Sequence, residues 1–210
     1  NTVRGWELTD RALQIRGGRG YETERSLRAR GEPPIGIERM LRDSRVNRIF
    51  EGSSEVMHLF IAREAVDRHL QVAGPLIDPA VRVRKKIQLL PAVAWFYLRW
   101  YPALWLGFVW ARHGEFGRLA THVRYLDRSS RRLARTIFHG MLRFGPALEK
   151  KQAFLFRAVD VALELFALTA TALRAQRERH HQPNAEALAL RACELSLERA
   201  DAALRAMWHN

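Results

Sequence analysis

Apolar residues recur at helical spacing along the second half of the chain. From position 115 onward they return every three or four residues, with polar residues, many of them arginine, between them. The recurring positions are Leu119, Val123, Leu126, Leu133, Ile137 and Met141, then Phe154, Ala158, Val161, Leu165, Leu168, Ala172 and Leu173, and finally Leu188, Leu195, Ala202 and Leu204. We therefore predict three helices, the last extending to about Met207, each with one buried face.

Two short breaks separate these helices. Gly145-Pro146 interrupts the pattern after the first, and Pro146 suits the first turn of the next helix. Gln182-Pro183-Asn184 predicts a turn before the third helix, with Asn184 as its N-cap. Short connections place successive helices antiparallel, so residues 115–210 are predicted to form an antiparallel helical bundle.

The first third of the chain also reads as helical. A further helix is predicted from Val56 to about Leu70, with Ser53 or Ser54 as N-cap and Glu55 near its positive end. The stretch Ser26–Pro34 contains one glycine and two prolines, and we expect it to be an exposed loop. The predicted fold class is all-α.

Positive charge is concentrated in the middle of the chain. The net charge is +13, and residues 78–150 hold 14 basic and 4 acidic residues, which is nearly the whole excess. Within this region, residues 87–111 are rich in Trp, Tyr and Phe and have the length of a membrane span. Arg99 near the centre, together with Pro91 and Pro102, argues against a span.

Two roles for these aromatic residues stay open at the level of the sequence. Trp and Tyr beside Arg82, Arg84, Lys85 and Lys86 are typical of a membrane interface, where aromatic rings lie at headgroup depth. Alternatively, they cover the core of a neighbouring domain or of a second subunit. A nucleic-acid-binding module is a further alternative, but we expect no nucleic acid partner, because the aromatic residues are mixed with Leu, Val and Ala.

A glycine-rich run, residues 14–21, lies near the start of the chain. Gly17, Gly18 and Gly20 allow positive φ and close approach of the backbone to a ligand. By itself the run is a weak signal, since such runs are commonly turns at a helix end. No strand pattern precedes it, so it is not a dinucleotide-binding fingerprint.

Glu51 is the acidic residue with the most informative surroundings. It follows Ile49 and Phe50 and precedes Gly52, just before a predicted helix start. It is either an ordinary loop carboxylate or a catalytic base in an apolar pocket. In the second case desolvation raises the pKa of the carboxyl group towards neutrality, where it can accept a proton during turnover.

The two runs, residues 14–21 and 48–55, together resemble the closing segment of the acyl-CoA dehydrogenases, and the order, spacing and flanking residues agree. The resemblance implies FAD as cofactor and Glu51 as the base that removes the α-proton of a fatty acyl thioester. It places Gly52 against the thioester and Arg63 at a basic, substrate-binding position. The implied FAD contacts are Ser53, Ser54 and Glu55 at the adenine end, and Gln14, Ile15, Arg16, Gly17 and Gly18 towards the flavin of a neighbouring subunit.

Two residues depart from the family pattern. Ser53 stands where relatives often have Thr, which keeps the hydroxyl group. Arg16 stands where many have an aromatic residue or His, which puts one flavin contact in doubt.

The resemblance covers only residues 4–70. We expect residues 1–73 to be the C-terminal portion of the catalytic domain, 74–114 a basic and aromatic connecting segment, and 115–210 an appended helical bundle like that of very-long-chain members. The segments that a complete enzyme needs upstream are missing, so the chain is expected to be a fragment that is inactive alone.

The resemblance also implies partners. These are a fatty acyl-CoA substrate, long-chain by analogy, a homo-oligomer (a dimer or dimer of dimers) and an electron-transferring flavoprotein as acceptor. One cysteine, Cys193, indicates a reducing compartment and predicts a cytoplasmic protein, with contact to the inner face of the membrane as an extension. The 31 arginines against 4 lysines indicate a GC-rich bacterial source. His180-His181 has no partners at ligand spacing, so no metal is expected.

Overall fold

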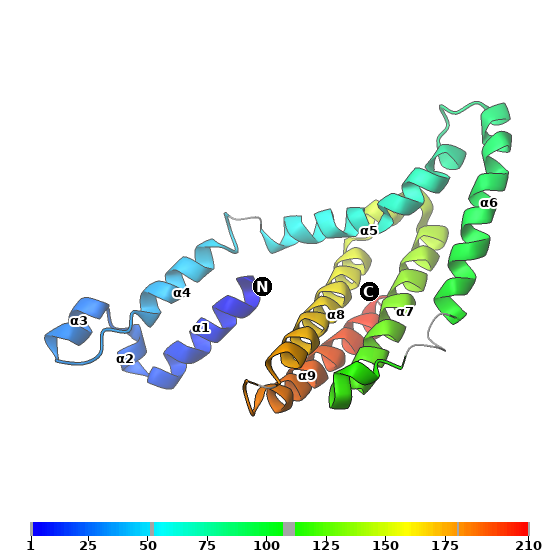
Figure 1. The fold of residues 1–210 in the computed structure, drawn as a ribbon. Helices are drawn as coiled ribbons and strands as arrows, with labels where there is room; N and C mark the ends of the chain where they lie inside the picture. Colours follow the sequence, from blue (N-terminus) through cyan, green and yellow to red (C-terminus); the bar gives the residue numbers. More distant parts are fainter. Residues whose placement is uncertain (1, 51–52, 107–111, 180, 210) are drawn as a thin grey trace. The chain divides into compact units, whose positions relative to one another are not determined.

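The computed structural model describes residues 2–50, 53–106, 112–179 and 181–209. Every regular element in these ranges is a helix, which confirms the all-α prediction. The chain forms two compact units, Asn1–His58 and Leu59–Asn210. The helices, labelled in Figure 1, are α1 Thr2–Arg16, α2 Gly18–Tyr21, α3 Glu24–Ala29, α4 Ile37–Val46, α5 Ser54–Ile77, α6 Val83–Leu106, η1 Gly114–Leu119, α7 Ala120–Phe144, η2 Gly145–Lys150, α8 Gln152–Glu178 and α9 Ala185–Ala206.

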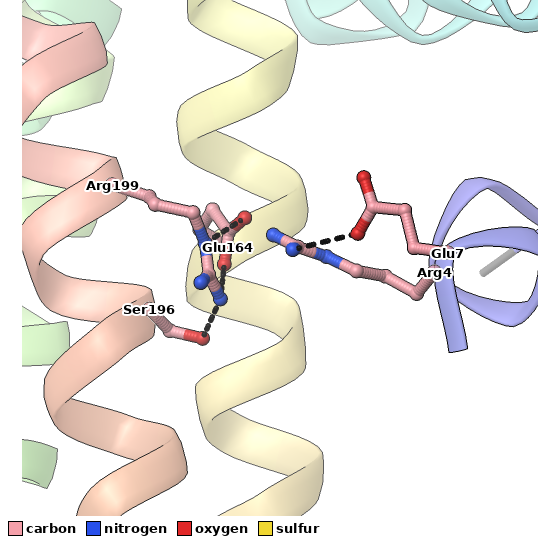
Figure 2. A network of polar contacts seen from close by, with 5 residues as sticks. All are labelled: Arg4, Glu7, Glu164, Ser196 and Arg199. Atoms are coloured by element: carbon pink, nitrogen blue, oxygen red, sulfur yellow. Dashed lines mark hydrogen bonds and ion pairs between the residues drawn. The ribbon is translucent and has the colours of Figure 1, made fainter. Parts of the chain in front are cut away.

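In the first unit, α1 packs against α4. Trp6 of α1 lies under two guanidinium groups, those of Arg45 and Arg48, at 5.6 and 5.3 Å from its ring centre. On the surface of α1, Arg4 donates to Glu7 one turn later at 3.3 Å (Figure 2). Contacts of this exposed kind contribute little each to stability.

The prediction of a loop over Ser26–Pro34 is wrong in its first half, which belongs to α3. The Thr23 hydroxyl accepts a hydrogen bond from the backbone N–H of Ser26 and caps this helix. Glu22 accepts a second bond from the Ser26 hydroxyl at 2.6 Å, and this bond lowers the pKa of the Glu22 carboxyl. Leu27 is completely buried, so an apolar side chain holds this segment against the rest of the unit. The glycine and prolines of the segment had suggested an exposed loop instead.

The helix predicted to end near Leu70 continues to Ile77 as α5, with Pro75 in its last turn. Pro75 has no N–H group, so one intrahelical hydrogen bond is lost in this last turn. The loop after α5 turns at Asp78, whose carboxylate accepts a hydrogen bond from the N–H of Ala80 at 2.8 Å. The chain then enters α6, which contains both Pro91 and Pro102.

The antiparallel bundle predicted for the second half is confirmed as α7, α8 and α9, which lie side by side in Figure 1. Its main core joins α5, α7, α8 and α9 through Ala62, Leu133, Ile137, Leu148, Phe154, Leu155, Ala158, Val159, Val161, Leu165, Ala200, Leu204 and Met207. A second cluster continues the core with Leu119, Val123, Leu168, Ala172, Ala175, Ala189 and Cys193. The apolar positions predicted for the first two helices of the bundle therefore supply half of these buried core residues, ten of twenty.

The predicted inward face of α9 is wrong at Leu188 and Ala202, whereas the predicted Leu195 is partly buried. Leu188 is 70% exposed and Ala202 is also exposed, whereas Leu204 is buried as predicted. The buried positions are Ala189, Cys193, Ser196, Ala200 and Leu204. Small side chains let α8 and α9 approach closely, so the buried face of α9 is not its most hydrophobic face. In α8, Leu173 is 53% exposed, again contrary to the prediction.

Two arginines tie α8 to α9. Arg199 donates to both carboxylate oxygens of Glu164, at 2.7 and 2.9 Å, and to the Ser196 hydroxyl at 3.2 Å (Figure 2). Such paired bonds fix the rotation of one helix against the other. Arg157 donates to the carbonyl groups of Ala206 and His209, which satisfies acceptors that the C-terminal end of α9 leaves free.

Candidate functional site

The glycine run forms a tight turn between α1 and α2. Gly17 has φ +56°, a conformation that favours glycine, and its N–H donates to the carbonyl of Gln14 at 3.0 Å. Gly17 and Gly18 are exposed, and a side-chain carbon added to either would meet nothing within 4 Å. The turn therefore presents bare backbone with open space in front of it.

Gly20 has a different role from its two neighbours. It is buried, and a Cβ there would lie 2.5 Å from the carbonyl oxygen of Leu13. This glycine is needed for packing of α2 on α1. The run thus contains one glycine explained by the fold and two that the fold leaves exposed.

The residues before this turn are unusually accessible. Ile15 is 86% exposed, Gln14 is exposed and Arg16 is partly exposed. A large apolar side chain in this position gains nothing from the fold of its own unit.

The second motif forms the start of α5 as predicted. Ser53 is the N-cap, and its hydroxyl accepts a hydrogen bond from the N–H of Val56 at 3.4 Å. Glu55 lies in the first turn, near the positive end of the helix dipole. Ser54 is the first residue of α5, so all three predicted adenine-side residues gather at one helix start.

Glu51 and Gly52, the predicted base and the predicted thioester contact, lie outside the described residues. The two apolar residues before them are exposed in this chain, Phe50 at 82% and Ile49 at 56%. Arg63, the predicted basic position, lies on the exposed side of α5. The apolar pocket expected around Glu51 stays a prediction.

The two motifs do not form one site within the unit. The Gly17 turn follows the C-terminal end of α1, and Ser53 follows the C-terminal end of α4; Figure 1 shows these at opposite ends of the α1–α4 pair. With α1 about 22 Å long at roughly 1.5 Å per residue, one ligand edge cannot contact both.

A third cluster, which sequence reasoning did not find, surrounds His69 of α5. His69 is 6% exposed, and its ring stacks on Tyr97 with centres 5.8 Å apart and meets the edge of Trp100 at 4.6 Å. Its Nδ1 lies 3.2 Å from the hydroxyl of Tyr97, at hydrogen-bond distance. Phe138 of α7 completes the cluster at 5.8 Å, so His69 joins three helices.

Burial sets the ionisation of these groups. It lowers the pKa of His69 and raises the pKa of Tyr97, because both charged forms lose solvation. Farther along α6, Tyr101 is hydrogen-bonded to His139 at 3.0 Å, and the guanidinium of Arg135 lies 4.0 Å from the Trp105 ring centre. No sequence periodicity predicts such pairs, since Tyr101 and His139 are 38 positions apart.

Other chemistry is limited in the described part of the chain. Cys193 is buried, and burial raises the pKa of its thiol to about 11, so packing is the role that the structure supports. No group of three potential metal ligands occurs among the described residues, and His180 lies outside them. Among the helices described, none combines the length and the apolar character that crossing a bilayer requires.

Residues 2–66 match the family model for the C-terminal domain of acyl-CoA dehydrogenase. This range contains both motifs and nearly the whole first unit. The chain therefore belongs to the acyl-CoA dehydrogenase family, and its residues 2–66 correspond to the C-terminal domain of that family.

Individual relatives extend the likeness beyond that domain. The probable acyl-CoA dehydrogenase FadE10 of Mycobacterium tuberculosis is 49% identical over 207 residues, which cover 96% of this chain and 32% of FadE10. The human mitochondrial very-long-chain specific acyl-CoA dehydrogenase is 29% identical over 178 residues, covering 82% of this chain and 25% of the relative. The appended bundle thus also has counterparts in the family.

A solved structure shares the fold. It is an acyl-CoA dehydrogenase complexed with FAD from Bacillus anthracis, with a TM-score of 0.68 and 22% identity over 98% of this chain and 32% of that one. The chain spans between a quarter and a third of the length of these relatives.

Proposed function

We propose that this chain is the C-terminal part of an FAD-dependent acyl-CoA dehydrogenase that desaturates the α,β-bond of a fatty acyl-CoA. In this proposal Glu51 takes the α-proton, Gly52 lies against the thioester and Arg63 contacts the substrate. The 49% identity to FadE10 over nearly the whole chain is the observation that carries the proposal. The expected division at residues 73 and 114 belongs to the same proposal.

The residues present fit a flavin cofactor. Gly17 and Gly18 offer exposed backbone without side chains in front of it, and Ile15 offers an uncovered apolar surface beside that backbone. At the other motif, Ser53, Ser54 and Glu55 present hydroxyl and carboxylate groups at a helix start, suited to the polar adenosine end. When bound, FAD supplies the acceptor for the hydride that leaves the β-carbon.

The work of this chain is then proton removal and positioning. Glu51 must be unprotonated at the α-carbon, and an apolar environment closed by parts of the assembled enzyme would raise its pKa towards neutrality. Exposed Phe50 and Ile49 fit such closure, because they are apolar surfaces with no cover in their own unit. A homodimer or dimer of dimers provides the neighbouring subunit, and an electron-transferring flavoprotein would reoxidise the flavin.

Replacing Glu51 by Gln in the full-length protein tests the catalytic assignment. The amide keeps the shape of the side chain but cannot take a proton, so acyl-CoA-dependent reduction of the flavin is expected to fall by at least about 100-fold, the lower range for loss of a general base. Flavin content should stay unchanged. Glu64→Gln, at an exposed position of α5 with no proposed role, is the matched control. Normal turnover by Glu51→Gln would remove Glu51 from the mechanism.

The structure also supports a second proposal, contact of α6 with a membrane surface. Five apolar residues of α6 form what we call the outer stripe: Val83, Ile87, Leu90, Leu98 and Trp105, which are 51–72% exposed. Their spacing places them on one helix face. Arg82, Arg84, Lys85 and Lys86 lie at the start of the same helix, so cations and an exposed apolar face occur together, as in helices that lie on anionic membranes.

Vesicle binding distinguishes this contact from nucleic-acid binding. The protein is expected to sediment with vesicles containing phosphatidylglycerol and to release at high salt, while retention on DNA at the same ionic strength stays weaker. Leu98→Glu, in the middle of the outer stripe, should reduce vesicle binding at least tenfold. Leu163→Glu, an exposed leucine on α8, is the control that should leave it unchanged. Equal vesicle binding by both variants would exclude the outer stripe as the contact.

A further inference from the structure

Apolar side chains form an exposed row on α8. Intervals of three and four residues place them on one face of the helix, and the members of this row, which we call the α8 row, are Leu163, Phe166, Ala167, Ala170 and Leu173. Phe166 is 65% exposed, Leu173 53% and Leu163 42%. Large apolar side chains that follow one another along a helix form a contiguous patch, which is more typical of a contact surface than single exposed leucines are.

The same face of α8 is buried one and two turns before the row begins. Leu155 and Val159 lie on it four residues apart, and they line an apolar hollow together with Ile61 and Val66 of α5. They are only 8% and 2% exposed. Another helix therefore covers this face at its beginning, and from Leu163 onward the described residues leave it open.

The α8 row is complementary to itself when two copies of the helix run antiparallel. A two-fold axis level with Leu168 places Phe166 of one copy opposite Ala170 of the other, because each lies two residues from the axis. Leu163 and Leu173, each five residues from the axis, meet in the same way. Each aromatic ring then faces a methyl group, which leaves room for the ring and allows the two helices to approach closely.

Charges beside the α8 row agree with the antiparallel orientation. Asp160 and Arg174 are both exposed, and they lie eight and six residues from Leu168 in opposite directions. In the antiparallel pair, Arg174 of one copy is therefore offset from Asp160 of the other by two residues, or roughly 3 Å along the helix. The long arginine side chain spans this offset, so two ion pairs form, one on each side of the axis. A parallel pair would instead place Arg174 beside Arg174.

We propose that the α8 row is a contact between two copies of this chain, with the two helices antiparallel about Leu168. Burial of the apolar row drives the contact, and the pairs of Asp160 with Arg174 set the orientation. The contact uses neither sequence motif nor the outer stripe, so it requires neither a flavin nor a membrane. One helix pair buries on the order of 1,000 Å² or less, the lower limit for specific interfaces, so we expect a weak dimer with a Kd on the order of 100 µM.

Sedimentation equilibrium of the 210-residue chain tests the contact. Between about 5 and 500 µM the average mass should rise from that of a monomer towards that of a dimer, and a chain that stays monomeric throughout overturns the proposal. Phe166→Glu should raise the Kd at least about tenfold, because each dimer loses two buried rings and gains two buried charges. Leu142→Glu changes a leucine of α7 that is 69% exposed, and it is the matched control that should leave the Kd unchanged. Equal Kd values for the two variants rule out the α8 row.

Charge exchange and cross-linking test the orientation, with circular dichroism to establish that each variant is folded. Arg174→Asp and Asp160→Arg should each weaken the dimer, because each brings like charges together, and the double variant should recover most of the affinity. Ala167→Cys, one residue from the axis, should be joined to its counterpart by a short bismaleimide, whereas the buried Cys193 does not react.

Leu173→Cys is the control for cross-linking, because its two copies lie ten residues, or about 15 Å, apart along the axis. It should give little covalent dimer. A double charge variant that associates no better than the single ones, or equal cross-linking of Leu173→Cys and Ala167→Cys, overturns the antiparallel contact.

Discussion

The three glycines of the run from Gln14 to Tyr21 each meet a different structural requirement. Gly17 needs its positive φ, Gly18 needs only an uncovered backbone, and Gly20 needs the space that a Cβ would fill. Composition alone predicts a turn here, but it does not assign these separate requirements. The distinction comes from the carbonyl of Leu13, which approaches only after α2 has packed on α1.

Replacing Gly20 by Ala is expected to destabilise the protein by about 1–3 kcal/mol, since the added carbon would lie 2.5 Å from the Leu13 carbonyl oxygen and force the backbone apart. Gly18→Ala is the control, because its Cβ would meet nothing within 4 Å, and its effect should stay within about 0.5 kcal/mol. Urea unfolding measures both. If the two variants unfold at the same urea concentration, the close approach at Gly20 is not a constraint.

At the scale of elements, the sequence predicts which segments are helices better than it predicts which faces of those helices are buried. The buried faces of α7 and α8 follow from periodic Val, Leu, Ile and Phe. The face of α9 does not, because Ala189, Cys193 and Ala200 are buried by close helix approach while Leu188 stays exposed. Hydrophobicity ranks side chains one at a time, whereas helix packing selects them by shape.

The cluster around His69, where α5, α6 and α7 meet, likewise could not be predicted from the sequence. Histidine is a polar residue, and the structure buries it among aromatic rings contributed by two other helices. The contact with Tyr97 spans 28 positions, beyond any local periodicity. Such clusters between helices can be recognised only when the tertiary fold is known.

From the burial of His69 we predict that the stability of the protein depends on pH. Burial lowers the pKa of His69 in the folded state, so between the ordinary value of 6.5 and the lowered value the unfolded chain binds more protons. Stability therefore falls as the pH drops below about 6.5, by at most about 1.4 kcal/mol per pH unit, and levels off below the folded pKa. His69→Phe keeps an aromatic ring and should remove this part of the slope. Parallel pH profiles for the two proteins between about pH 7.5 and 5 would contradict the assignment.

For the molecule as a whole, the family and the fold class follow from the sequence, while the geometry of the catalytic site does not. The two motifs with their spacing are sufficient to recognise an acyl-CoA dehydrogenase, and the comparison with FadE10 extends this to 96% of the chain. Phe50 and Ile15 are exposed in the first unit, so the pocket that we propose around Glu51 would need apolar surfaces from elsewhere in the assembled enzyme.

The sealed position of Cys193 has a practical consequence. It is the single cysteine of the sequence and is 1% exposed, and burial raises the pKa of its thiol to about 11, so thiol-directed reagents find almost no thiolate at neutral pH. A fluorophore or spin label attached to an engineered surface cysteine would therefore report from one known place, with the native thiol left untouched. Distances between such labels on the two units would measure their arrangement in solution directly.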